Sequence, residues 1–155
     1  MKIEDSFTVA APPDKVWAFL TDPARMLACV PGCESIEAID PLRYRAAVRI
    51  SLGVIKTRFH VVVEIVEQEP PHRVVSKTRG EEGTKSSMLS ADSILTLVPA
   101  DGGTEVHYSS EATLTGRLGK FGFGMLKKQA EKLGEEFADR VRAALETEPA
   151  EARQA

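Results

Sequence analysis

The stretch LGKFGFGMLKKQAEKLGEEFADRVRAAL, residues 118–145, decides how the rest of the chain must fold. Apolar or small residues recur in it at steps of three and four, at Leu118, Gly122, Leu126, Ala130, Leu133, Phe137, Val141 and Leu145. This spacing is typical of an amphipathic helix with one apolar stripe, and charged residues fill its opposite side. At roughly 1.5 Å per residue, the predicted helix is about 40 Å long.

The rest of the chain offers no second long helix against which this stripe could pack. It alternates instead between apolar and polar residues, which is the pattern of β-strands with one face towards a core. The predicted strands cover residues 2–9, 33–40, 43–52, 54–68, 73–79, 87–98 and 104–115. Two short helices are predicted at residues 14–20 and 23–30, and the segment Thr21-Asp22-Pro23 ends the first and caps the second. Residues 80–85 are predicted to form a flexible loop.

These elements predict an α+β fold. We expect a curved antiparallel sheet of about seven strands, two short helices, and one long C-terminal helix across the concave face of the sheet. The length of 155 residues suits one domain with a sizeable core. We assign that domain to residues 1–146 and interpret residues 147–155, which lack apolar content, as a flexible tail.

The composition excludes several classes of function. A net charge of -3 and an aromatic content of 6% argue against binding to nucleic acid. The chain begins without the apolar segment of a signal peptide, and no apolar run is long enough to span a membrane. Two cysteines, Cys29 and Cys33, are too few for a structural zinc site, and no histidine is spaced to complete one. We expect a cytoplasmic protein without a metal site.

Two motifs carry a resemblance to a known family. The first is Phe7-x-Val9-x-Ala11-Pro12-x-x-x-Val16-Trp17-x-x-Leu20-x-Asp22-Pro23, which resembles the opening of the helix-grip superfamily of START domains, polyketide cyclases and pathogenesis-related proteins. The second combines the turn Pro31-Gly32-Cys33 with the glycine-rich stretch TGRLGKFG at residues 115–122. This combination resembles the G subunit of carbon monoxide dehydrogenase, and the match spans about residues 1–146.

The resemblance implies a non-catalytic accessory protein of a molybdenum hydroxylase of the carbon monoxide dehydrogenase type. Such a protein would hold a quinone- or lipid-like molecule between sheet and long helix, and would require no cofactor of its own. Members linked to membrane recruitment carry a long C-terminal extension. Because this sequence stops soon after the long helix, we do not expect membrane anchoring from it. A peripheral location at the inner membrane face stays open as an alternative to the cytoplasm.

Small residues occupy the strand positions that face the long helix, and they predict a cavity. Side chains such as Ala91 and Ala112 oppose a helix that begins with three glycines, so both walls lack the volume that close packing requires. We expect an apolar cavity near the N-terminal half of the helix. Its predicted lining residues are Tyr44, Val48, Ile50, Phe59, Val61, Leu89, Ala91, Ser93, Tyr108, Ser110, Ala112, Phe121 and Met125. Each position alone also suits an ordinary core.

Polar groups on this face have two interpretations. Ser93, Ser110 and Tyr108 could bind a carbonyl or hydroxyl of a ligand, or they could bond to each other and to the backbone. The helix glycines Gly119, Gly122 and Gly124 also have two interpretations. Each lowers the stability of a helix by up to about 1 kcal/mol relative to alanine. They predict a hinge or gate of the cavity, or a simple close contact between helix and sheet.

A group of basic residues projects from the opposite face of the sheet. Arg45, Arg49, Lys56 and Arg58 come from strands that we expect to be neighbours. They could form a docking patch for an acidic surface of the partner dehydrogenase, or an ordinary solvated face with cross-strand ion pairs.

No catalytic residue is predicted. The three histidines fall on outward or turn positions, and no carboxylate falls on an inward strand position of the predicted strands. Three hypotheses stay open: a carrier of an apolar ligand, a cyclase-like enzyme of the same superfamily, and an assembly factor without a ligand.

Overall fold

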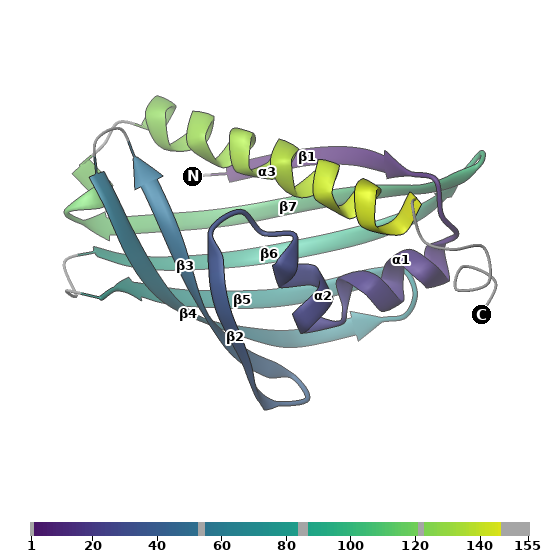
Figure 1. The fold of residues 1–155 in the computed structure, drawn as a ribbon, viewed down its shortest axis with the longest axis horizontal. Helices are drawn as coiled ribbons and strands as arrows, with labels where there is room; N and C mark the ends of the chain where they lie inside the picture. Colours follow the sequence, from purple (N-terminus) through teal and green to yellow (C-terminus); the bar gives the residue numbers. More distant parts are fainter. Residues whose placement is uncertain (1, 53–54, 84–86, 121–122, 147–155) are drawn as a thin grey trace.

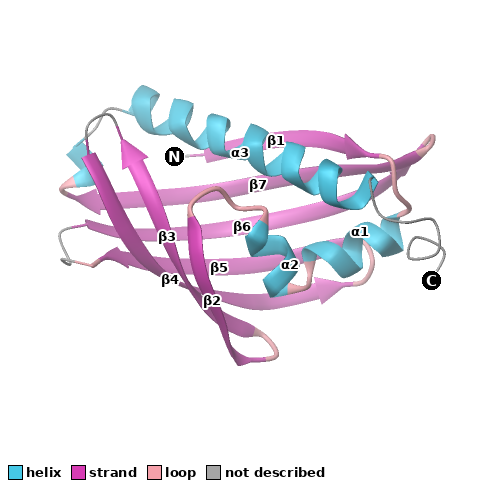
Figure 2. Cartoon of the chain, in the orientation of Figure 1, coloured by secondary structure: helices cyan, strands magenta, loops and turns pink. Residues whose placement is uncertain are grey.

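The computed structural model describes residues 2–52, 55–83, 87–120 and 123–146. Its frame is a seven-stranded antiparallel sheet with the strand order β1-β7-β6-β5-β4-β3-β2. Figure 1 shows the long helix α3 running across the curved sheet, and Figure 2 shows the two short helices on the same side as α3. The predicted fold class is therefore confirmed.

The strands are β1 (Lys2–Val9), β2 (Cys33–Asp40), β3 (Arg43–Leu52), β4 (Ile55–Glu69), β5 (Arg73–Glu82), β6 (Ser87–Ala100) and β7 (Gly103–Gly116). The helices are α1 (Pro13–Leu20), α2 (Pro23–Ala28), the short 3-10 helix η1 (Leu118–Lys120) and α3 (Phe123–Glu146). Asp22 caps α2 as predicted, because its Oδ1 accepts the backbone N–H groups of Ala24 at 3.1 Å and Arg25 at 3.4 Å. Every strand except β5 lies close to its predicted bounds at both ends.

At one edge of the sheet, β2 pairs with β3 and has an open outer side. Its register against β3 shifts twice, between Cys33 and Ser35 and again between Ala38 and Asp40. Such shifts bend a strand and increase its twist. The strand is short and acidic, with carboxylates at Glu34, Glu37 and Asp40.

The long helix begins later than its sequence pattern predicts. Leu118 belongs to η1, is only 1% exposed and packs against Phe59. It therefore belongs to the buried apolar stripe although it is not part of the α-helix. A Cβ on Gly119 would lie 2.5 Å from the carbonyl oxygen of Leu114. The chain can therefore pass this close to β7 only with glycine at residue 119, and the regular helix starts at Phe123.

Strand β5 is longer than predicted, because it includes Gly80, Glu81 and Glu82 of the expected loop. Gly80 pairs with Val61 on one side and Leu89 on the other. A Cβ on Gly80 would lie 2.6 Å from Cγ1 of Val61, so the side chain of the neighbouring strand occupies the space beside this glycine. Gly80, which indicates a loop in the sequence, thus allows a close contact between β4 and β5.

The extension of β5 buries a carboxylate that the sequence pattern missed. Glu82 is 0% exposed, and its Oε1 accepts a hydrogen bond from Nη2 of Arg117 in the turn before η1. Ser87 is also buried, and its Oγ accepts the backbone N–H of Leu118 at 2.9 Å. The expectation that no carboxylate points inward was wrong, because residues 80–82 were assigned to a loop. The Arg117–Glu82 pair connects the end of β5 to the start of the helix segment.

The apolar side chains of the described residues form three core clusters. The main cluster joins α1 and the C-terminal half of α3 to β1, β6 and β7, with Val16, Val106 and Val141 each 0% exposed. The Tyr44 cluster centres on Tyr44 and Ala46, and the Phe59 cluster on Phe59 and Leu118. Between residues 124 and 136 of α3, no side chain is buried. The described part of the helix is thus packed tightly only over its C-terminal turns.

The Arg117–Glu82 pair generates a stability prediction. Removing one partner of a fully buried ion pair lowers the free energy of unfolding by about 3–5 kcal/mol. Because the side chain of Arg117 is 46% exposed, we expect Arg117→Met to lower it by roughly 2 kcal/mol at pH 7. The hydrogen bond from Arg117 lowers the pKa of Glu82 in the folded protein. The ion pair therefore stabilises the fold fully above the ordinary carboxyl pKa, and this stabilisation is lost as the pH falls through the pKa of Glu82 in the folded state. Urea unfolding at pH 7 and pH 4 should show a smaller loss at pH 4. A double variant with Glu82→Gln should recover most of the stability, and an equal loss at both pH values would contradict this role.

The two described helix-segment glycines generate a second prediction. Gly119→Ala should lower the free energy of unfolding by about 1–3 kcal/mol, because the backbone of Leu114 cannot yield easily. Gly124→Ala is the matched control: nothing lies within 4 Å of its added Cβ, so it should gain up to about 1 kcal/mol from helix propensity. Chemical unfolding of both variants measures the difference. Equal effects would show that Gly119 makes no close contact in solution.

Candidate ligand-binding site

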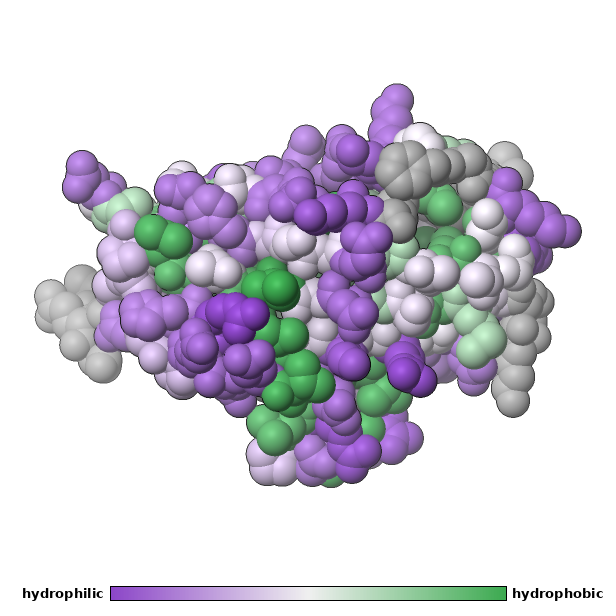
Figure 3. Space-filling view, turned by 180° about the vertical axis from the view of Figure 1, so that it is seen from behind, coloured by the Kyte–Doolittle hydropathy of each residue, from purple (hydrophilic) through white to green (hydrophobic). Residues whose placement is uncertain are grey.

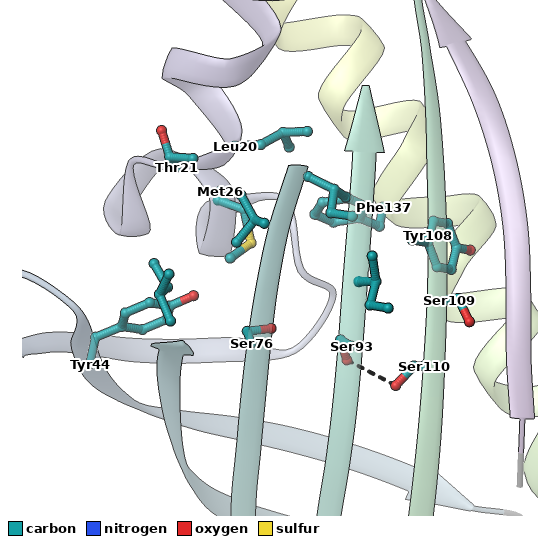
Figure 4. Close-up of a pocket in the computed structure, with 14 residues that line it drawn as sticks. Leu20, Thr21, Met26, Tyr44, Ser76, Ser93, Tyr108, Ser109, Ser110 and Phe137 are labelled. Carbon is teal, nitrogen blue, oxygen red and sulfur yellow. Dashed lines mark hydrogen bonds between the residues drawn. The ribbon is translucent and has the colours of Figure 1, made fainter. Parts of the chain in front are cut away.

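A cavity of about 250 Å³ lies between the sheet, the two short helices and the C-terminal half of α3. Figure 4 shows its walls, with side chains from β3, β5, β6 and β7 facing Met26 of α2 and Phe137 of α3. The lining residues are Leu20, Thr21, Met26, Tyr44, Ile65, Val74, Ser76, Ser93, Ile94, Leu95, Tyr108, Ser109, Ser110 and Phe137. The cavity is thus nearer the C-terminal half of α3 than the N-terminal half that the glycines predicted.

A row of serines crosses the floor of the cavity. Ser76, Ser93 and Ser110 are register partners on the adjacent strands β5, β6 and β7, so their side chains lie side by side on the same face. Ser93 Oγ and Ser110 Oγ are 3.0 Å apart and share one hydrogen bond. A pair of hydroxyls that shares one bond keeps one O–H free to donate to a third group.

Tyr44 reaches into the cavity from β3, on the side opposite to the Ser93–Ser110 pair (Figure 4). The residue is 6% exposed, and burial raises the pKa of its phenol to about 12. The hydroxyl is therefore a neutral hydrogen-bond donor at any physiological pH. Within the described part of the chain, the structure shows no hydrogen-bond partner for it.

Tyr108 lines the cavity, while its hydroxyl points away from the serine row. The oxygen lies against Gly134 of α3, so close that a Cβ at residue 134 would overlap it. Burial, and then the negative charges of Asp5, Glu131 and Glu135, raise the pKa of this phenol. These carboxylates belong to β1 and the exposed side of α3, which places the hydroxyl away from the serine row.

Four of the predicted cavity residues, Tyr44, Ser93, Tyr108 and Ser110, line this cavity together. The others lie elsewhere: Val48, Ile50, Phe59, Val61 and Leu89 pack in the Tyr44 and Phe59 clusters, while Ala91 and Ala112 lie in the sheet between those clusters and the serine row. Met125 does not line the cavity; it is 42% exposed, next to Leu126, which packs against the Phe59 cluster. Phe121 lies outside the described residues.

The sequence pattern missed several lining residues, for different reasons. Phe137 belongs to the predicted apolar stripe of α3, and its position along the helix was the available signal. Ser76 lies on β5, whose alternation is weak, and only the register of β5 against β6 brings it beside Ser93. Leu20 and Met26 come from the short helices, which a sequence pattern does not place over a particular strand.

The predicted gate glycines have different surroundings. Gly119 makes the close contact with Leu114 described above, which is the simpler of the two interpretations for this residue. Gly124 faces open space. Gly122 lies outside the described residues. A movement of the helix start at these positions stays a prediction.

The predicted docking arginines project outward, and two of them are paired. Glu34 Oε1 accepts from Arg58 Nε at 2.6 Å, and Glu34 Oε2 accepts from Arg49 Nη2 at 3.4 Å, which is the cross-strand arrangement of a solvated face. Arg45 and Lys56 are exposed. Figure 3 shows this outer face, where hydrophilic side chains surround a band of apolar ones. Val62 and Val66 are among the large apolar residues that are exposed in the described part of the chain.

Two further findings concern the described residues only. None of their helices is both long and apolar enough to cross a bilayer. No three His, Cys, Asp or Glu side chains among them are grouped in a way that could hold a metal ion. The cavity wall itself contains two titratable side chains, the tyrosines Tyr44 and Tyr108.

Comparison with known proteins identifies the family. A family model described as the G subunit of carbon monoxide dehydrogenase (CoxG) matches residues 6–146, whereas no curated protein matches the chain. A conserved protein from Geobacillus kaustophilus is 25% identical, with a TM-score of 0.85 over 93% of this chain and 94% of its own. A START superfamily protein from Mycobacterium smegmatis is 14% identical, with a TM-score of 0.72 over 94% and 97% of the two chains, which shows a shared fold. Because the family model spans nearly the whole described structure, the chain belongs to the CoxG family of carbon monoxide dehydrogenase G subunits.

Proposed function

We propose that this protein binds the ring of a small apolar molecule, such as a quinone, in the cavity beside Tyr44 and serves as a carrier for a molybdenum hydroxylase. The family and the START-like fold indicate a ligand-binding accessory protein. The observation that carries the finer proposal is the cavity itself, whose described lining residues, from the sheet and the three α-helices, are apolar, aromatic or hydroxyl-bearing and include no charged side chain.

The volume of the cavity limits the part of the ligand that it can hold. An apolar cavity of about 150 Å³ is enough to bind benzene. At about 250 Å³, this cavity has room for one substituted ring, but not for a long isoprenoid chain as well. Such a chain would continue along Ala112 and Ala91, beneath the part of α3 in which no described side chain is buried.

The partner enzyme is the part of the proposal that depends on family membership. A carrier of a redox-active ring needs an enzyme that reduces or oxidises it, and the family name points to carbon monoxide dehydrogenase. Of the predicted docking residues, Arg45 and Lys56 have no ion pair with a described residue, whereas Arg49 and Arg58 share an ion pair with the single carboxylate of Glu34. We therefore place the acidic surface of the partner against Arg45 and Lys56.

The cavity proposal predicts that filling the space prevents binding. Ser93→Leu adds a larger apolar side chain to the floor, and we expect it to weaken the binding of duroquinone, a tetramethylated benzoquinone, by at least about ten-fold. Ser90→Leu is the matched control, because residue 90 is exposed on the opposite face of the same strand. Isothermal titration calorimetry measures both, and thermal unfolding shows that both variants fold. Wild-type affinity in Ser93→Leu would place the ligand outside this cavity.

The docking proposal predicts a charge-dependent interaction. Arg45→Glu together with Lys56→Glu should reduce the amount of carbon monoxide dehydrogenase retained by the immobilised protein at low salt, because both reversals oppose an acidic surface. Lys132→Glu, on the exposed side of α3, is the control. Retention that does not respond to the double reversal would contradict this surface, and it would leave the ligand cavity unaffected.

A further inference from the structure

The polar groups of the cavity wall are all neutral. Among the residues that the structure describes, its lining contains three aligned serines, two further hydroxyl residues and two tyrosines, and no Lys, Arg, His, Asp or Glu. A carboxylate or phosphate that enters such a site loses its water and meets no positive charge, which is strongly unfavourable. The described part of the wall therefore disfavours charged ligands, whatever their shape.

Most of these hydroxyls already have a partner or point away. Thr21 Oγ1 donates to the backbone carbonyl of Trp17 at 2.7 Å. The Tyr108 hydroxyl lies against Gly134, and the Ser109 oxygen points away from the neighbouring serines in Figure 4. These groups do not offer a donor to the middle of the cavity.

Tyr44 is different, because the residue is more than nine-tenths buried, its hydroxyl points into the cavity, and this hydroxyl has no hydrogen-bond partner among the described residues. Among the described residues, the buried side-chain oxygen without a partner is Oε2 of Glu82, so the Tyr44 hydroxyl is accessible from the cavity and can donate to an acceptor on a ligand there. On the far side, the Ser93–Ser110 pair keeps one O–H free for a second acceptor. Tyr44 therefore lies on one side of the cavity, and the serine row, which includes Ser76 with no hydrogen-bond partner among the described residues, lies on the other.

We infer that the cavity selects a neutral ring with a carbonyl group that accepts a hydrogen bond from Tyr44, and rejects the carboxylate of a fatty acid. This inference rests on the proposed function, because it takes the cavity as the binding site. It separates the two ligand classes that the family resemblance leaves together, quinones and lipids. Tyr44 is then the residue that determines specificity for the carbonyl.

Three ligands of nearly the same shape test the inference at pH 7. They are duroquinone, which has two carbonyls; durene, the same tetramethylated ring without them; and 2,3,5,6-tetramethylbenzoate, which carries a carboxylate. We expect duroquinone to bind about ten-fold or more tightly than durene, and the benzoate to bind at least about a hundred-fold more weakly than duroquinone. Dissociation constants come from calorimetry or from ligand-induced shifts in thermal unfolding.

Tyr44→Phe isolates the hydroxyl, because it keeps the ring that packs in the Tyr44 cluster. We expect it to weaken duroquinone binding about five- to ten-fold and durene binding less than about two-fold, so the loss depends on the ligand carbonyl. Since the hydroxyl has no partner among the described residues, the unliganded variant should unfold at the same temperature as the wild type or slightly higher. A lower unfolding temperature would reveal a partner for the hydroxyl and overturn the inference.

The outcomes separate this inference from the proposed function. If wild-type protein binds duroquinone and the benzoate equally, or if Tyr44→Phe weakens duroquinone and durene by the same factor, the inference is overturned while the carrier function stands. If none of the three ligands binds, or if Ser93→Leu binds duroquinone like the wild type, the proposed function itself fails. Tight duroquinone binding that depends on Tyr44, with the benzoate excluded, supports both.

Discussion

The apolar concave face of the sheet is wider than one helix can cover, and the rest of the structure follows from this mismatch. Helix α3 is packed against the sheet through Val141 and Leu145 near its C-terminal end, while Leu118 fixes the chain just before its start. Between these two attachments the facing residues are small, and none of the described helix side chains is buried. A sheet that curves around a helix held in this way encloses space, because interiors fill to normal density only where side chains are large enough.

The same geometry separates two kinds of polar chemistry. A buried ionised group, Glu82, lies at the end of the molecule where the helix segment begins, and Arg117 balances its charge. The polar groups of the cavity at the other half of α3 are hydroxyls. Because a buried charge requires a fixed partner and a hydroxyl does not, the first region holds the fold together while the second stays available for a ligand.

Much of this could be predicted from the sequence, and the exceptions have a common cause. Alternation correctly indicates which strand residues face inward, so Tyr44, Ser93, Tyr108 and Ser110 could all be found in advance. Alternation does not show which inward residues become neighbours, because that depends on strand register and on where each helix crosses the sheet. Ser76 was missed for this reason.

The start of α3 and the end of β5 show the other kind of exception. Three glycines at the helix start indicate mobility or space by composition, yet Gly119 is required for a close approach to the backbone of Leu114. Gly80 and the residues after it look like a loop, yet they pair in the sheet and bury Glu82. In both cases a tertiary contact decides what the glycine does, and local propensity cannot report that contact.

The open outer side of β2 has a consequence for the behaviour of the protein at high concentration. Free backbone N–H and C=O groups at a sheet margin can recruit the strand of another molecule and start a fibre. Two interruptions of the ladder distort this margin, and charged side chains at Glu34, Glu37 and Asp40 line it, which makes pairing with the strand of another molecule unfavourable. The fold can therefore keep a long sheet with a cavity on its concave face, while its β2 edge resists pairing with other molecules.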